Sequence, residues 1–137
     1  MKQIIILIFV SAFLMQFTCG KTKGEGGPLE EINWHLAEYT FQKQKHIPIG
    51  KEDITLRLEG NQLNGHGGCN RYFGSYSIAG VTLSISSIGA TEMACPVVMQ
   101  QEQNFFYLLE NARAYTSINS TLTIFSKKGQ LVFKSGP

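Results

Sequence analysis

Apolar and polar residues alternate with a period of two over much of the chain after residue 31. Ile54, Leu56 and Leu58, for example, are separated by polar residues, and such spacing is typical of strands with one buried face. Pairs of turn-forming residues separate these runs. The predicted strands cover residues 34–39, 54–59, 62–69, 72–77, 81–86, 116–118, 122–125 and 131–133, with turns at Gly60-Asn61, Ala79-Gly80, Asn119-Ser120 and Lys128-Gly129.

One segment follows a helical period instead. Pro96 suits the first position of a helix, where no N–H is needed, and an apolar stripe containing Phe105 and Leu109 continues to about residue 113. We therefore expect a mainly β (α+β) fold. It is a compact antiparallel β-barrel of about eight short strands, with a helix over residues 97–113 packed at one open end and burying Phe105 and Leu109.

The first residues have a different character. Lys2 precedes an almost unbroken apolar run over residues 4–17, which is too short for a comfortable membrane span and is typical of an export signal. The run ends at Cys19, in a context that resembles a bacterial lipobox, although Gln16 and Thr18 depart from its best form. An ordinary cleaved signal with an incidental cysteine is the alternative.

We therefore predict a lipoprotein signal peptide over residues 1–18, a lipid anchor on Cys19, a flexible tether over residues 19–30 and one domain over residues 31–137. Glycine and mixed charge dominate the tether, a composition that cannot form a core. The predicted location is the bacterial cell envelope, on the outer membrane facing the periplasm, because Gly20 rather than Asp follows the cysteine.

Overall charge adds little to this picture. The chain has 12 Lys and Arg against 10 Asp and Glu, so no strong field favours nucleic acid, and we expect no nucleic-acid partner. Membrane contact is expected through the lipid anchor alone.

Two motifs resemble those of the META domain, also called the HslJ-like family. The first is the stretch over residues 68–76, GCNRYFGSY, and the second is ATEMACP over residues 90–96. A strand with tryptophan, here at Trp34, precedes them in the family. The resemblance implies a secreted or lipid-anchored bacterial protein, no established enzymatic reaction, and structural roles for Trp34, Gly68, Cys69, Asn70, Gly74, Tyr76, Thr91, Met93 and Cys95.

The side chains in these motifs suggest particular structural roles. We expect the Asn70 side chain to bond nearby backbone or its backbone to hold a positive φ. Thr91 is expected to satisfy backbone groups at a turn, and Met93 to fill core volume. Gly74 is expected to allow a close approach between elements.

Cys69 and Cys95 are the first candidates for chemistry. Three interpretations stay open: a disulfide, two buried free thiols, or metal or redox chemistry. A disulfide between them would close a loop of about 26 residues and contribute about 3 kcal/mol in the chain-entropy model.

His66 lies near Cys69 in sequence, but without paired short ligand spacings it is expected to be an ordinary strand histidine. We expect no metal, cofactor or catalytic residue, and expect His35 and His46 to be exposed without partners.

Three functions are compatible with the sequence. The first is a non-enzymatic envelope lipoprotein that acts as a structural or protein-interaction module in envelope or stress physiology. The second is a barrel that binds lipid or another small molecule, by resemblance to secretin pilotins, and the partner would then be an apolar ligand. The third is a thiol redox protein that uses Cys69 and Cys95.

Overall fold

The computed structural model describes residues 28–136. The predicted signal peptide, Cys19 and most of the predicted tether lie outside the described residues. Within them the elements, in chain order, are β1 (Trp34–Phe41), β2 (Gln44–His46), β3 (Thr55–Glu59), β4 (Gln62–His66), β5 (Arg71–Ala79), β6 (Thr82–Ala90), α1 (Met99–Glu110), β7 (Ala112–Ile118), β8 (Thr121–Ser126) and β9 (Gly129–Ser135).

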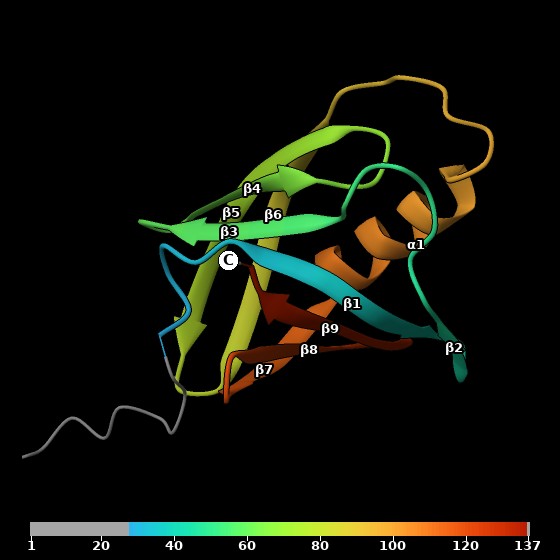
Figure 1. Cartoon of the computed structure of the whole chain (residues 1–137). Coiled ribbons are helices and arrows are strands. Elements are labelled where there is room, and N and C mark those ends of the chain that lie inside the picture. The colour runs from blue at the N-terminus through green and yellow to red at the C-terminus, as the bar shows by residue number, and fades with distance from the viewer. Residues whose placement is uncertain (1–27, 137) are drawn as a thin grey trace, which may run out of the picture.

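The strands form a closed antiparallel barrel (Figure 1). From β3 to β8, each strand pairs with the strand that follows it in the chain. Strand β1 pairs with β3 on one side and with β9 on the other, and the second pairing closes the ring. Strand β2 pairs with β1 alone, outside this ring. The predicted barrel with one helix is therefore confirmed, and β2 is an additional strand that the sequence pattern did not indicate.

The tight turns explain where several strands end. Gly60 and Asn61 have φ values of 56° and 69°, and Asn119 and Ser120 have 49° and 60°, the left-handed values that two-residue hairpins require. The two other predicted turns are displaced by one residue, to Gly80-Val81 and Lys127-Lys128. Gly80 occupies the first central position of its turn, where glycine suits a type II′ turn, the other common two-residue hairpin turn.

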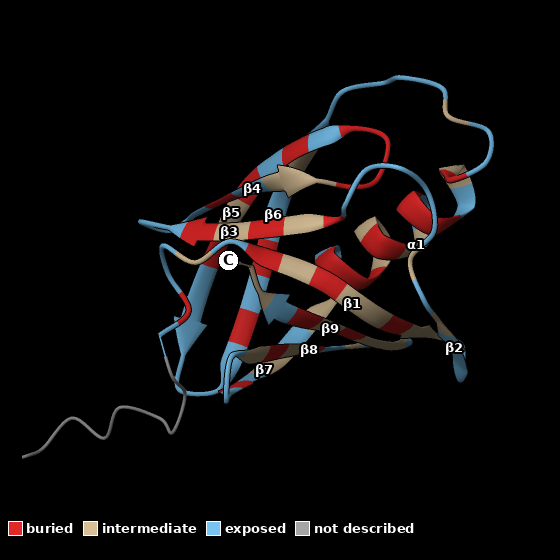
Figure 2. Ribbon diagram, viewed as in Figure 1, coloured by how far each residue is buried: buried red, intermediate tan, exposed pale blue. Residues whose placement is uncertain are grey.

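Large apolar side chains fill the interior of the barrel (Figure 2). On β3 the alternation of buried Leu56 and Leu58 with more exposed neighbours matches the sequence pattern. Helix α1 contributes Phe105, Leu108 and Leu109, each 0% exposed, so the predicted burial of Phe105 and Leu109 is confirmed. The helix closes one end of the barrel and packs against β1, β6, β8 and β9.

Helix α1 is shorter than the sequence predicted. It begins at Met99 rather than at residue 97, and Pro96 lies in a turn before it. The carbonyl of Cys95 accepts hydrogen bonds from the N–H groups of Val98 and Met99, at 3.0 and 3.1 Å. This turn, formed directly after Cys95, delays the start of the helix. Helix α1 also ends before Arg113, because β7 starts at Ala112.

The antiparallel order gives the barrel two distinct ends. The loops over residues 47–54 and 91–98 lie at the end that α1 covers, here called the α1 end (Figure 1). Pro28 and Gly136 lie at the opposite end, here called the terminal end, where the Gly136 N–H donates to the Asn33 carbonyl at 2.8 Å. Both ends of the described chain are thus on one side of the barrel.

Residues 28–30 are the part of the predicted tether that the structure describes. Leu29 is 8% exposed and belongs to the core, and its carbonyl accepts a 3.0 Å hydrogen bond from the Trp34 indole N–H. The chain is thus fixed to the barrel before β1 begins. Over residues 28–136, no helix has the length and apolar character needed to span a membrane.

Candidate functional site

The two family-like motifs meet at the α1 end of the barrel. Cys69, between β4 and β5, forms a disulfide with Cys95, in the loop before α1. Of the interpretations left open for this pair, the disulfide is therefore the one that the structure contains. It joins two segments that are 26 residues apart in the chain.

The side chain of Asn70 connects the same two segments. Its Oδ1 accepts hydrogen bonds from the Met93 N–H at 2.7 Å and from the Thr91 hydroxyl at 2.9 Å. Its Nδ2 donates to the Met93 carbonyl at 3.3 Å. Asn70 and Thr91 thus both bond backbone as expected, but across the two segments rather than within their own turns: Asn70 bonds Met93, and Thr91 Oγ1 accepts from the Arg71 N–H.

Glu102 supplies the third part of this network from helix α1. Its Oε2 accepts hydrogen bonds from the N–H groups of Cys69 and Asn70, at 2.9 and 2.6 Å, and its Oε1 accepts from Asn70 Nδ2 at 2.7 Å. The residue is 3% exposed. These three donors offset the cost of removing the carboxylate from water.

Sequence reasoning missed this role of Glu102. The sequence does contain a sign of a buried acid, because the ionisable residue Glu102 lies on the apolar stripe of the predicted helix. Such a position requires buried partners for the carboxylate. Two of its three partners, however, are backbone N–H groups, which no sequence motif identifies.

Two glycines of the first motif occupy positions that a side chain would disturb. Gly68 has a φ of 101°, in a region that residues with a side chain rarely adopt. At Gly74, a Cβ atom would lie 2.8 Å from Ile88 Cδ1 and 3.0 Å from the Ser86 carbonyl oxygen. The predicted close approach at Gly74 is therefore confirmed.

The prediction for Met93 was wrong. Its side chain is 56% exposed and fills no core volume. What the fold uses is its backbone, whose N–H and carbonyl both bond Asn70. The loop therefore turns the Met93 side chain toward solvent.

Trp34 and Tyr76 belong to the core, at 1% and 5% exposed. The Tyr76 hydroxyl donates a hydrogen bond to the Glu30 carboxylate. Burial, together with this acidic neighbour, raises the pKa of Tyr76 to about 12.

The histidines have structural partners. His66 Nδ1 accepts from the Gly68 N–H at 3.1 Å. The expectation that His35 and His46 lack partners was wrong: His35 Nδ1 lies 3.2 Å from Asp53 Oδ2, and His46 stacks on Tyr39 with ring centroids 4.8 Å apart. Among residues 28–136, no three His, Cys, Asp or Glu side chains are grouped in a way that could hold a metal ion.

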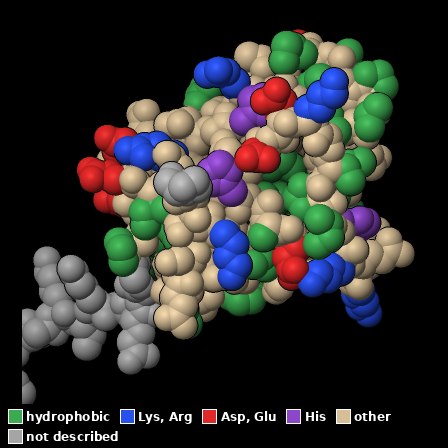
Figure 3. Space-filling model, viewed as in Figure 1, with side chains coloured by type: hydrophobic (Ala, Val, Ile, Leu, Met, Phe, Trp, Pro, Cys, Tyr) green, Lys and Arg blue, Asp and Glu red, His purple; other side chains and the backbone are tan. Residues whose placement is uncertain are grey.

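Apolar side chains are exposed on the two loops that the network holds. We define the apolar loop surface as Ile47, Ile49, Met93 and Val97, which are 62%, 57%, 56% and 80% exposed. Figure 3 shows hydrophobic side chains at the upper right and further down the right side of the molecule; in Figure 1 the 91–98 loop runs at the upper right, and the 47–54 loop rises from β2 beside α1.

A buried glutamine fixes one of these loops to α1. Gln101, 6% exposed, accepts from the Ile49 N–H at 2.8 Å and donates to the Ile49 carbonyl at 2.9 Å. Gly50 lies against Val98 as well. The 47–54 loop and the start of α1 are thus held together, beside the loop that the disulfide anchors.

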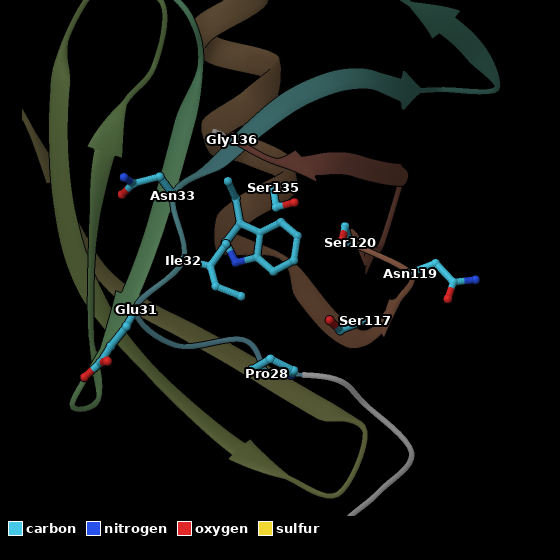
Figure 4. A pocket seen from close by; sticks show the side chains of 10 residues that line it. Pro28, Glu31, Ile32, Asn33, Ser117, Asn119, Ser120, Ser135 and Gly136 are labelled. Carbon is cyan, nitrogen blue, oxygen red and sulfur yellow. The ribbon is translucent and has the colours of Figure 1, made fainter.

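A pocket of about 470 Å³ lies at the terminal end (Figure 4). Its walls come from the segment before β1, from the β7–β8 hairpin and from the end of β9. It is separate from the barrel interior, which the core side chains fill. The lining residues are Pro28, Glu31, Ile32, Asn33, Trp34, Ser117, Asn119, Ser120, Ser135 and Gly136.

Fold and site together define a class of small β-barrel domains: one helix covers an end of the barrel, and a disulfide with an Asn–Glu network fixes the loops there. The chain belongs to the META domain family, whose model matches residues 27–136.

Solved structures share the fold. A protein from Burkholderia xenovorans, determined by NMR, is 23% identical, with a TM-score of 0.66 over 79% of this chain and 83% of that chain. A DUF4847 family protein from Bacteroides vulgatus ATCC 8482, a crystal structure, is 14% identical, with a TM-score of 0.52 over 82% of this chain and 94% of that chain. The search of the curated proteins found no match.

Proposed function

We propose that this META-family protein is a non-enzymatic binding module of the bacterial cell envelope. In this proposal Cys19 carries a lipid anchor in the outer membrane, and the barrel binds an envelope protein through the apolar loop surface. The sequence context of Cys19 supports the anchor, and the family resemblance supports a role in envelope or stress physiology.

The observation that carries the binding role is the apolar loop surface. Four exposed apolar side chains lie on two loops whose backbones are held by Gln101, Asn70 and the disulfide. Holding a surface in one conformation before binding lowers the entropy lost when a partner docks. Exposed apolar groups of this kind mark interaction sites in many proteins.

The position of the apolar loop surface favours a protein, rather than the membrane, as its binding partner. The chain enters the barrel at Pro28, at the terminal end, whereas the apolar loop surface lies at the α1 end. A tether that reaches the membrane from Pro28 is attached at the terminal end and leaves the α1 end free. The surface is then available to another envelope protein.

Site-specific photo-crosslinking in intact cells tests the binding role. A photoreactive residue replacing Val97, which is 80% exposed, should give one discrete product with a second protein. The matched control replaces Ile118, which is 59% exposed near the terminal end, and should not give that product. Adding Ile49→Asp should abolish the Val97 product, whereas adding Val81→Asp should not.

Several results would overturn the binding role. They are the absence of a discrete product from Val97, the same product from Ile118, or a product with twice the mass of the chain. The last result would assign the surface to self-association.

The anchor is tested separately by intact mass. The chain purified from native membranes should begin at Cys19 and carry the added mass of lipid. The Cys19→Ser variant should lack that mass and leave the membrane fraction. A chain that begins at an unmodified Cys19 would exclude the anchor and leave the binding role to the crosslinking result.

A further inference from the structure

The pocket at the terminal end has the features of a small-molecule site. Its volume of about 470 Å³ falls within the range of roughly 300–1,000 Å³ that ligand pockets usually have. It lies at the opposite end of the barrel from the apolar loop surface, so its use does not depend on the function proposed above.

The walls of the pocket combine apolar side chains with hydroxyl groups. Pro28 and Ile32 face the space (Figure 4), and Trp34 is also part of the lining. Ser117 is only 5% exposed, yet its hydroxyl points into the pocket. A hydroxyl directed into an open space can donate a hydrogen bond to a ligand or accept one from it.

The charges of the lining limit the ligand further. Among residues 28–136, the lining has no Lys, Arg or His, and its one ionisable residue, Glu31, points away from the space (Figure 4). The nearby Arg57 guanidinium already donates to the Glu31 carbonyl and to Asn33 Oδ1, at 3.0 and 3.3 Å, so no lining cation is left to pair with an anionic group. The lining therefore favours an uncharged molecule.

The pocket is also held in shape by the backbone around it. The Trp34 indole N–H donates to the Leu29 carbonyl at 3.0 Å, which fixes the segment before β1. The Ser135 N–H donates to the Ser120 carbonyl at 3.0 Å, which ties the β7–β8 hairpin to the end of β9. A ligand thus meets walls that are already in place, which favours binding.

We infer that this pocket binds an uncharged amphipathic small molecule, with its apolar part against Ile32, Pro28 and Trp34 and a hydroxyl or carbonyl group hydrogen-bonded to Ser117.

The single tryptophan of the chain makes a direct test possible, because Trp34 is part of the lining of the pocket. The exported chain carrying Cys19→Ser, which holds no lipid, is titrated with the uncharged dye N-phenyl-naphthylamine and with its sulfonated analogue. The uncharged dye should give saturable energy transfer from Trp34 and should bind about tenfold more tightly than the anion, which finds no cation.

Ser117→Leu fills the pocket and removes the hydroxyl, so it should weaken binding of the uncharged dye by about tenfold. The matched control is Ser84→Leu on an exposed strand position, which should leave binding unchanged. Should Ser117→Leu fail to fold, Ser120→Leu at the exposed rim of the pocket provides the second variant.

NMR shift mapping on the chain with native Ser117 locates the dye independently of these variants. Shifts should concentrate in residues 28–34 and 117–120. Shifts confined to the α1 end, equal binding of both dyes, or equal effects of Ser117→Leu and Ser84→Leu would each overturn the inference.

Discussion

The carboxylate of Glu102 connects three segments that are distant in sequence: helix α1, the bend before β5 and, through Asn70, the loop before α1. It reaches no cation within hydrogen-bond distance among the described residues; its partners are N–H groups. A carboxylate accepts on both oxygens at once, which an amide side chain cannot do. The position therefore requires a side chain with an acceptor on both of its branches.

Glu102→Gln should lower the free energy of unfolding by about 2–3 kcal/mol, because one side of the amide is a donor that would face the donors of Cys69 or Asn70. The matched control is Glu110→Gln, an exposed position of the same helix, where a change below about 0.5 kcal/mol is expected. Urea unfolding of both variants measures the difference. Equal losses in the two would show that the network contributes no stability.

Three tyrosines predict how stability depends on alkaline pH. Burial raises the pKa of Tyr39 and Tyr72, and it raises that of Tyr76, together with Glu30, to about 12. In the unfolded chain tyrosine titrates near pH 10, so the unfolded state loses its protons first as pH rises. The free energy of unfolding should therefore be constant below about pH 10 and should fall as pH rises toward 12.

Urea midpoints measured across this pH range by circular dichroism provide the check. Tyr76→Phe should reduce the slope above pH 10, because it removes one of the groups that titrate differently in the two states. A slope that Tyr76→Phe leaves unchanged would contradict the assignment to Tyr76.

At the scale of elements, the disulfide and the 91–98 loop explain how β6 continues into α1. The loop has no regular structure of its own, and its position is set by Cys95 and by the backbone of Met93. Cross-linking two points of a chain restricts the unfolded ensemble. The loop is therefore ordered by its two attachments rather than by packing of its exposed side chains.

The double variant Cys69→Ala, Cys95→Ala should lose about 3 kcal/mol of stability in the chain-entropy model for a separation of 26 residues. It should keep the barrel, because the interior is packed independently of the sulfur atoms. Adding reductant should destabilise the unmodified protein and leave the double variant unaffected. A double variant as stable as the unmodified protein would contradict this prediction.

These elements also show what a sequence can specify. Alternation along β3 and the Gly60-Asn61 turn predict their hairpin, because both signals are local. Strand β2 was missed because Gln42 and Lys43 form its turn with φ values of 50° and 70°, and neither residue type signals a turn. The meeting of Asn70, Glu102 and the 91–98 loop depends on long-range packing, so only the resemblance of the motifs indicated that these segments belong together.

At the scale of the whole molecule, the seams between strands differ in strength. Strands β1 and β9 share seven register pairs, whereas β6 and β7 share the single pair Thr82 and Ala114. Helix α1 connects β6 to β7 and packs against β6. The ring thus contains a long ladder between β1 and β9 and only a short contact between β6 and β7, beside the helix.

Amide hydrogen exchange should follow this difference. Amides of β1, β8 and β9 should be the most protected, whereas amides on the β7-facing side of β6, beyond the pair at Thr82, should exchange faster. NMR measurements resolved by residue provide the comparison. Protection in β6 equal to that in β9 would show that the helix seals this seam as well as a strand ladder would.

The placement of Pro28 at the terminal end has a mechanical consequence. If the chain is pulled at Pro28 while a partner holds the 91–98 loop, the load passes from β1 into the rest of the barrel. The hydrogen bonds of β1 to β9 lie across the strand axis and are loaded together, in shear, rather than broken one after another. The barrel is therefore oriented to resist tension between its point of attachment and its loops.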